Sequence, residues 1–195
     1  MNHLQFFIRW LHVIAGITWI GHLYFFNFVN VPLQAALDDA GKKAANPKLM
    51  PRALWWFRWG AMVTFLSGLL LYALVFMYDP MSGFGATGLR QPSPWIMMGM
   101  TFGFIMWFNV WFIIWPIQQK ILRGTAPAEA LPGMRRKAYL ASRANTYLSG
   151  PMLFGMLGSN HASAGGPVAL IVACVLGFAA IWAAIFHAGF VGQSA

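Results

Sequence analysis

The chain has 195 residues, of which 59% are hydrophobic and only 9% are charged. Soluble domains carry roughly 25% charged residues, so this composition excludes an ordinary soluble protein. The formal net charge of +9 resembles that of nucleic-acid-binding proteins, but the cations lie in loops between apolar stretches, so no nucleic-acid partner is needed to explain them. A chain of this length predicts one domain, over residues 1–195.

Five apolar runs follow one another, each near the roughly 20 residues that cross a bilayer as a helix. They cover residues 5–31, 54–78, 95–117, 143–161 and 167–190. The fourth is the least apolar and contains Gly150 and Pro151. The first is too long and too polar for a cleaved signal peptide. We therefore predict an all-α integral membrane bundle of about five transmembrane helices.

Lysine and arginine predict its orientation. The stretches that join runs one to two and three to four, with the adjoining helix ends, carry eleven of them, against two on the other side. Because basic loops stay on the cytoplasmic side, the N-terminus is expected outside and the C-terminus inside. The basic segments 32–50 and 119–139 are candidates for short surface helices. Outer segment 79–94, rich in Gly and Pro, is expected to be irregular.

The sequence lacks the motifs that are typical of soluble enzymes and of cysteine-based metal sites. Cys174 is the one cysteine, which excludes a disulfide framework, a CxxC metal site and a CxxCH haem attachment. P-loop, Rossmann and nucleophile-elbow patterns are also absent. The spacing of Gly99 and Gly103 allows close helix packing without indicating any chemistry.

Histidines are the candidates for chemistry, since ionisable side chains at membrane depth are expensive. At a rise of about 1.5 Å per residue, His12 and His161 fall near the outer side of the bilayer. His22 and His187 fall nearer the inner side. Imidazole is a common axial ligand of haem iron, and helical bundles build such sites from facing side chains.

The outer pair predicts a b-type haem held by His12 and His161. Small residues beside the ligands would admit the macrocycle, and Gly16 and Gly158 have that position. Trp19 lies seven residues after His12, on the same helix face. The inner pair, His22 and His187, is a secondary candidate for the same chemistry.

Other interpretations stay open. Each histidine can instead form a hydrogen bond between helices. Twelve methionines, with Met152 and Met156 one helical turn apart, suit copper, although methionine more often fills apolar space. Asn27 and Asn30, with polar residues 145, 146 and 149, can pack between helices or line a cavity.

Three stretches carry a family resemblance: RWLHVIAGITWIGHLYFFNFVNVP (9–32), LWWFRWGAMVTFLSGLLLY (54–72) and SRANTYLSGPMLFGMLGSNH (142–161). They resemble the N-terminal membrane domain of PuuD-type bacterial urate hydroxylases. Family members have more transmembrane helices and a C-terminal cytochrome c domain, which this chain lacks. The resemblance implies a multi-pass module of the bacterial inner (cytoplasmic) membrane that passes electrons to an external c-type cytochrome. His22 does not match a family position.

Three hypotheses follow. The first is a membrane redox subunit that binds haem b and exchanges electrons with an external c-type cytochrome or a larger membrane complex. The second is a urate hydroxylase-like oxygenase module. The third is a non-catalytic assembly or anchor subunit, or a copper-handling membrane protein.

Overall fold

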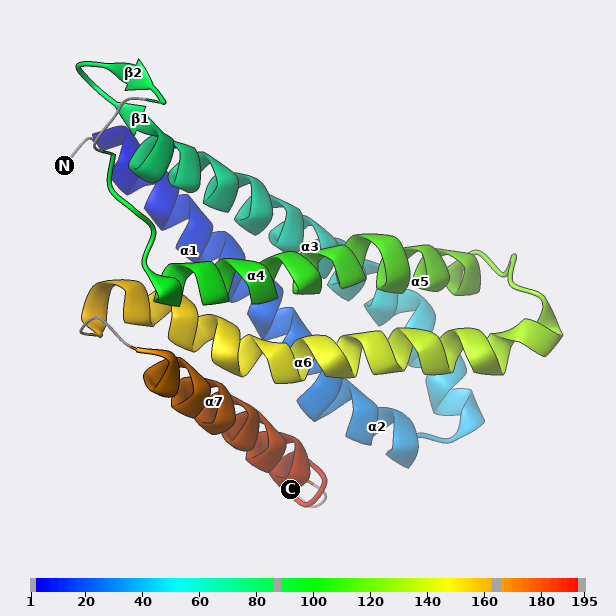
Figure 1. Ribbon diagram of the computed structural model, residues 1–195. Coiled ribbons are helices and arrows are strands. Elements are labelled where there is room, and N and C mark those ends of the chain that lie inside the picture. Colours follow the sequence, from blue (N-terminus) through cyan, green and yellow to red (C-terminus); the bar gives the residue numbers. More distant parts are fainter. Residues whose placement is uncertain (1–2, 86–88, 163–165, 193–195) are drawn as a thin grey trace.

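The computed structural model describes residues 3–85, 89–162 and 166–192. Five helical rods make up these residues, several of them built from consecutive helices (Figure 1). The elements are α1 (His3–Tyr24), η1 (Phe25–Asn30), α2 (Val31–Ala36), α3 (Asp39–Tyr72), η2 (Ala73–Met77), β1 (Tyr78–Asp79), β2 (Gly83–Phe84), α4 (Pro94–Phe108), η3 (Asn109–Ile114), α5 (Trp115–Leu122), η4 (Ala128–Ala130), α6 (Leu131–His161) and α7 (Pro167–Ala188). The predicted all-α fold is confirmed.

Four of the described rods are long and apolar enough to cross a membrane: His3–Ala36, Asp39–Met77, Pro94–Leu122 and Pro167–Ala188. The fifth, α6, contains the expected span 143–161 but is too polar to meet the same criterion. Its polar side chains Asn145, Thr146 and Ser149 are fully buried. The polar side chains of α6 therefore face the inside of the bundle, where α6 packs against α4 and α7.

Several helices extend beyond the apolar runs that predict them. Helix α3 begins at Asp39 rather than near residue 54, because the Asp38 carboxylate accepts a hydrogen bond from the Gly41 amide at 2.7 Å and caps it. Helix α6 likewise begins at Leu131 rather than near residue 143. The basic segments expected to form surface helices are thus mainly extensions of the spanning helices. Hydropathy does not detect such polar helical ends.

The helices form two crossing pairs and one flanking helix. Helix α1 packs along α3, and α4 packs along α6, while α7 lies against α6 (Figure 1). The pairs meet in a core whose largest buried members come from all four of these rods: Trp19, Leu23, Phe57, Met106, Val110 and Met152. Away from the crossing, the α1–α3 pair diverges from the ends of α4 and α6 (Figure 1).

Glycines permit the closest helix contacts. A Cβ on Gly99 would lie 2.9 Å from the Met156 amide nitrogen, so α4 and α6 touch backbone to backbone at this point. The close packing expected at Gly99 is therefore confirmed. On the other side of α6, a Cβ on Gly177 would lie 2.6 Å from the Pro151 nitrogen. Only residues without side chains allow α6 to approach both neighbours this closely.

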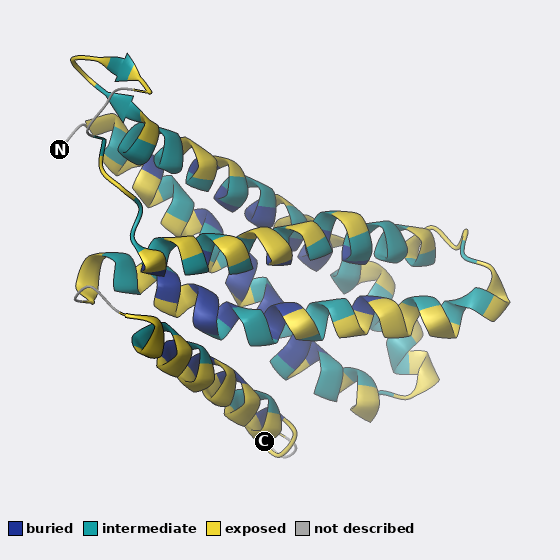
Figure 2. Cartoon of the chain, viewed as in Figure 1, coloured by how far each residue is buried: buried dark blue, intermediate teal, exposed yellow. Residues whose placement is uncertain are grey.

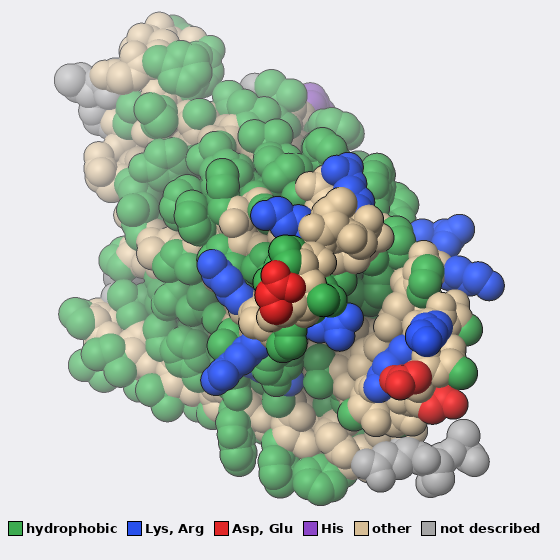
Figure 3. Space-filling model, turned by 90° about the vertical axis from the view of Figure 1, so that its right-hand side faces the viewer, with side chains coloured by type: hydrophobic (Ala, Val, Ile, Leu, Met, Phe, Trp, Pro, Cys, Tyr) green, Lys and Arg blue, Asp and Glu red, His purple; other side chains and the backbone are tan. Residues whose placement is uncertain are grey.

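Large apolar side chains cover the outside of the bundle, so exposed residues extend along the length of most helices (Figure 2). On α7, for example, Val168 is 73% exposed and Ile171 62% exposed. Such a surface suits lipid and not water. Lys and Arg side chains instead gather at the end of the molecule where α5 and α6 are joined (Figure 3). This separation agrees with a multi-pass membrane protein.

The segment expected to be irregular, residues 79–94, takes part in a small hairpin. Strands β1 and β2 pair antiparallel, with Tyr78 opposite Phe84. The Asp79 carboxylate accepts hydrogen bonds from the amides of Met81 and Ser82, both at 2.9 Å. These two bonds hold the pKa of Asp79 below its ordinary value. Residues 86–88 of the segment lie outside the described residues.

Candidate functional site

His12 is held in one orientation by the neighbouring helix α3. Its Nδ1 lies 3.1 Å from Ser67 Oγ. The Ser67 hydroxyl lies 2.6 Å from the Val63 carbonyl oxygen, which can only accept its proton. Ser67 Oγ is therefore available to accept from His12, and the Thr64 backbone on the same helix is a second hydrogen-bond partner of the ring. With the ring proton assigned to Nδ1, Nε2 keeps its lone pair, the form of imidazole that binds a metal.

The surroundings of His12 are small. Gly68 faces the ring, and a Cβ there would lie 3.1 Å from His12 Cε1. Ala15, one turn further along α1, is buried. Gly16 approaches α3 less closely, since a Cβ on it would lie 4.0 Å from Thr64 Cγ2. The absence of a side chain at Gly68 thus lets the imidazole pack against α3.

Trp19 shares the face of α1 that carries His12, as its spacing predicts. It is only 2% exposed and belongs to the core between the helix pairs. Its indole Nε1 is buried and has no hydrogen-bond partner among the described residues. A buried donor without an acceptor is costly, so Trp19 is a candidate to bind a polar group that the chain itself does not supply.

His161 is the last residue of α6 and is exposed. No hydrogen bond or ring contact joins its imidazole to another described residue, including His12. Gly158, one turn earlier, faces Trp95, and a Cβ on Gly158 would lie 2.7 Å from the indole. The space that Gly158 provides is thus used by Trp95 in this structure. Haem ligation by His12 and His161 remains a prediction.

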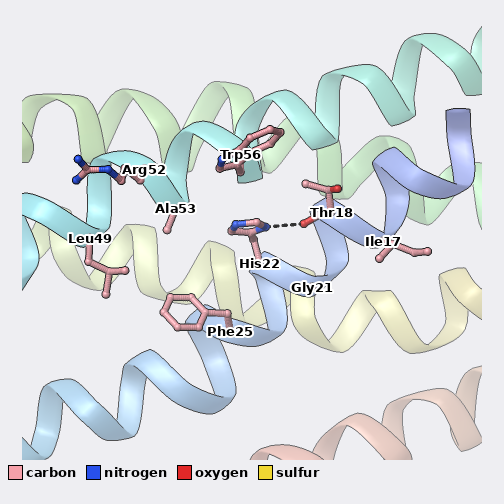
Figure 4. A pocket seen from close by; sticks show the side chains of 9 residues that line it. All are labelled: Ile17, Thr18, Gly21, His22, Phe25, Leu49, Arg52, Ala53 and Trp56. Carbon is pink, nitrogen blue, oxygen red and sulfur yellow. Dashed lines mark hydrogen bonds between the residues drawn. The ribbon is translucent and has the colours of Figure 1, made fainter.

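His22 and His187 occupy different surroundings. His22 donates from Nδ1 to the Thr18 carbonyl oxygen at 2.7 Å, because a carbonyl can only accept. It lines an open groove of 520 Å³ between α1, η1 and α3 (Figure 4). None of the described residues of α7 lines this groove, and His187 is exposed near the end of that helix. Ligation by this inner pair also remains a prediction.

The polar residues of α6 pack between helices. Asn145 accepts a hydrogen bond from Asn109 Nδ2 at 2.8 Å and donates to the Met106 carbonyl at 2.9 Å. Ser149 lies 2.9 Å from the Tyr24 hydroxyl. Both Asn145 and Ser149 are fully buried. Of the two interpretations of these residues, interhelical packing agrees with the structure.

Two features escaped the interpretation of the sequence. The Arg58 guanidinium stacks over Trp115 at 3.8 Å and lies 5.5 Å from the ring centre of Trp111. The pattern LWWFRW, an arginine among tryptophans, indicates a local contact such as that with Trp59 at 5.4 Å, but it does not indicate the distant partners Trp111 and Trp115. The second feature is Ser67 as the partner of His12. It lies 55 residues away, and no local pattern indicates that the two helices meet there.

The histidines do not form a multi-ligand metal site. Among the described residues, no three His, Cys, Asp or Glu side chains gather closely enough to hold a metal ion. Two soft sulfur atoms do meet, since Cys174 Sγ lies 3.5 Å from Met98 Sδ. The local geometry therefore offers single imidazoles and one sulfur pair as candidate ligands.

A comparison with models of protein families shows the family to which the chain belongs. The family model described as "Urate oxidase N-terminal" matches residues 1–45 and 86–191. The chain belongs to this family. The match covers α1, α4, α6 and α7 but excludes residues 46–85, which contain most of α3. No curated protein and no solved structure matches the chain.

The urate oxidase N-terminal family confirms the resemblance drawn from the sequence. Two of the three stretches that carry it, residues 9–32 and 142–161, lie within the matched residues. The third, residues 54–72, lies outside them. His12, His161 and His22 are therefore in matched segments, whereas Ser67 and Gly68 belong to the unmatched helix that contacts His12.

Proposed function

We propose that this member of the urate oxidase N-terminal family is a membrane redox subunit of a urate-oxidising system. It binds a b-type haem between its helices and exchanges electrons with a c-type cytochrome at the outer face of the bacterial inner membrane. The observation that carries this proposal is the state of His12. With the ring proton assigned to Nδ1, which lies against Ser67, Nε2 carries the lone pair that would bind iron.

The available side chains fit haem better than a bare metal ion. Without a gathered set of His, Cys, Asp and Glu among the described residues, the chain offers isolated imidazoles. A haem brings its own equatorial nitrogen ligands and needs only axial ones from the protein. The unpaired indole Nε1 of Trp19, on the same helix face as His12, adds a buried donor suited to a polar group of a cofactor.

The roles of the residues follow from their contacts. Ser67 orients the His12 ring and fixes its tautomer, as outer hydrogen-bond partners of metal-binding histidines do. Gly68 lets the ring pack directly against α3, and the apolar helix surfaces exclude water. His161, at the exposed end of α6, is the second residue proposed to hold the haem. Bound haem would supply reversible one-electron transfer.

A pyridine haemochrome assay on detergent-purified protein tests the proposal. We expect a Soret band and a stoichiometric b-type haem, which His12→Ala abolishes. Ser67→Ala should lower the haem affinity by about 10- to 100-fold, because it removes only the orienting acceptor. His3→Ala, an exposed histidine on the same helix, is the matched control. A colourless preparation, or equal haem content in His12→Ala and the wild type, refutes the proposal.

A second candidate is a hydroxylase module that acts on urate itself, favoured by the family to which the chain belongs. It predicts urate turnover only when an external c-type cytochrome is supplied. Urate consumption measured with and without that cytochrome distinguishes it from a pure electron-transfer subunit, which consumes none in either case.

A third candidate rests on the contact between Cys174 and Met98. Thiolate and thioether sulfur suit Cu(I), so a copper-handling protein would hold copper here. Elemental analysis should then find copper in proportion to protein, and Cys174→Ser should remove it. An assembly or anchor subunit would instead co-purify with a larger complex and carry neither copper nor haem.

A further inference from the structure

The groove beside His22 is built on the lipid-facing flank of the α1–α3 pair. Both helices belong to rods that are apolar and long enough to cross a membrane. Ile17 and Trp56 border the groove and are 64% and 55% exposed. Its volume of 520 Å³ falls within the roughly 300–1,000 Å³ of ligand sites. A molecule dissolved in the bilayer can therefore enter sideways, without crossing water.

His22 determines which hydrogen bond the groove offers. Because its Nδ1–H is donated to Thr18, neutral His22 presents Nε2 as an acceptor only. In Figure 4 the ring extends from α1 towards α3, with Trp56 on one side and Phe25 on the other. The best occupant is thus a membrane-soluble molecule that donates a hydrogen bond from a flat ring.

The walls of the groove suit such a ring. Trp56 and Phe25 offer aromatic faces. Gly21 precedes His22, and a Cβ on it would meet nothing within 4 Å. The space over this glycine is therefore open. Exposed apolar residues of α1, such as Ile17, continue outward from the groove and provide a surface for an attached hydrocarbon tail.

We propose that this groove binds a membrane quinol, a lipid-soluble aromatic diol, with one hydroxyl donating to His22 Nε2. The oxidised quinone has only carbonyl acceptors and would leave Nε2 without a donor. A phospholipid phosphate likewise has no proton to donate at neutral pH, and it would pair with the exposed Arg52, which also lines the groove. Hydroxyl or ammonium groups of a headgroup can donate to His22, but they are not carried on a flat ring and would leave the aromatic walls without a partner. The reduced quinol therefore satisfies both His22 and the aromatic walls, which the quinone and a phospholipid do not.

Binding of a short-tailed benzoquinol to the full-length protein tests this inference, with no need for bound haem. In phosphatidylcholine nanodiscs, under reducing and anaerobic conditions, we expect saturable binding by calorimetry. The quinol should bind roughly tenfold more tightly than its quinone, the effect of one satisfied hydrogen bond. Equal affinity for the two forms, or no saturable binding, overturns the proposal. This comparison requires no variant and so does not depend on any variant folding.

Variants locate the site. His22→Phe keeps an aromatic ring and removes the acceptor, so it should weaken quinol binding about tenfold and abolish the preference over quinone. Gly21→Leu should block the groove without touching its polar groups. The matched controls are His3→Phe and Gly133→Leu, since a Cβ on Gly133 also meets nothing within 4 Å. Equal losses in variants and controls refute the assignment.

The lipid environment provides the remaining test. If the groove holds an anionic headgroup instead, phosphatidylglycerol nanodiscs should suppress quinol binding and Arg52→Gln should restore it. That result overturns the proposal. Quinol binding that is unchanged by phosphatidylglycerol and by Arg52→Gln supports it.

Discussion

At the scale of single residues, two histidines differ in the partner of their Nδ1 atom. His12 Nδ1 lies against the hydroxyl of a serine on another helix, whereas His22 donates a hydrogen bond from Nδ1 to a carbonyl oxygen of its own helix. The first arrangement needs α1 and α3 to be packed, and the second survives in an isolated helix. The chemistry of His12 is therefore coupled to tertiary structure in a way that the chemistry of His22 is not.

Gly68→Ala tests the packing around His12. The new Cβ would lie 3.1 Å from His12 Cε1, so the ring must shift. We expect the free energy of unfolding in detergent to fall by about 1–3 kcal/mol, as for other overpacked sites. Gly133→Ala, where the added methyl meets open space, should raise it by up to about 1 kcal/mol. Equal effects of the two substitutions would contradict the close contact.

Arg58→Lys tests the aromatic surroundings of Arg58. Lysine keeps the charge but loses the planar group that stacks over Trp115 at 3.8 Å. A loss of about 0.5–2 kcal/mol in the free energy of unfolding is expected. Arg123→Lys, at an exposed position beyond α5, serves as the control and should change stability little. The two effects can be compared by chemical denaturation in the same detergent.

At the scale of helices, α6 is the organising element because it contacts both α4 and α7 and buries polar side chains. Its glycines bring the backbones together, and Asn145 then bonds to the Met106 carbonyl on α4. Hydrogen bonds between helices are worth roughly 1 kcal/mol each in a bilayer. The specificity of the α6 contacts thus comes from several weak interactions, the glycine backbone contacts and the interhelical hydrogen bonds, that are concentrated on this one helix.

Gly177→Ala tests the contact between α6 and α7. Its Cβ would lie 2.6 Å from the Pro151 nitrogen, and backbone atoms cannot turn away as a side chain does. We expect α7 to separate from α6, with a loss of about 1–3 kcal/mol in stability and faster amide exchange along α7. Ala180→Leu adds more volume on the exposed face of α7 and should change neither quantity.

The comparison of sequence and structure has a physical explanation at this scale. Apolar runs predict the membrane-spanning parts of the helices, since the bilayer requires apolar side chains there. They miss the first turns of α3 and α6, which are helical but polar. The partner of His12 could not be predicted either. Local periodicity indicates which face of a helix carries polar or functional side chains, but it does not indicate which distant helix packs on that face.

At the scale of the whole molecule, the two ends of the bundle differ in their number of basic side chains. Lys and Arg gather where α5 and α6 are joined (Figure 3), and the sequence places others along the start of α3 and few near the hairpin. This asymmetry agrees with a cytoplasmic location for the basic end. The proposed haem and the proposed quinol groove would then lie towards opposite sides of the bilayer.

Labelling of single cysteines tests this orientation. In a Cys174→Ser background, Ser82→Cys in the hairpin should react with a membrane-impermeant maleimide on intact spheroplasts. Glu129→Cys, between α5 and α6, should react only after lysis. Both native residues are exposed, so accessibility within the protein does not limit either reaction. The reverse pattern would place the N-terminus inside.

The three π-helical segments, η1, η2 and η3, have a consequence for how this bundle tolerates change in length. A π turn holds about one residue more than an α turn, so each segment absorbs an extra residue while the parts of the rod on either side of it keep nearly the same relative direction. Deleting one residue from Phe25–Asn30 should therefore close this segment into an unbroken α-helix with little rotation of α2, because the wide turn accommodates the residue that is removed. Deleting one residue from the regular part of α1 would instead rotate the side chains on one side of the deletion by about 100° relative to those on the other. The wide turns are thus the places where this bundle can lose a residue without changing its helix contacts.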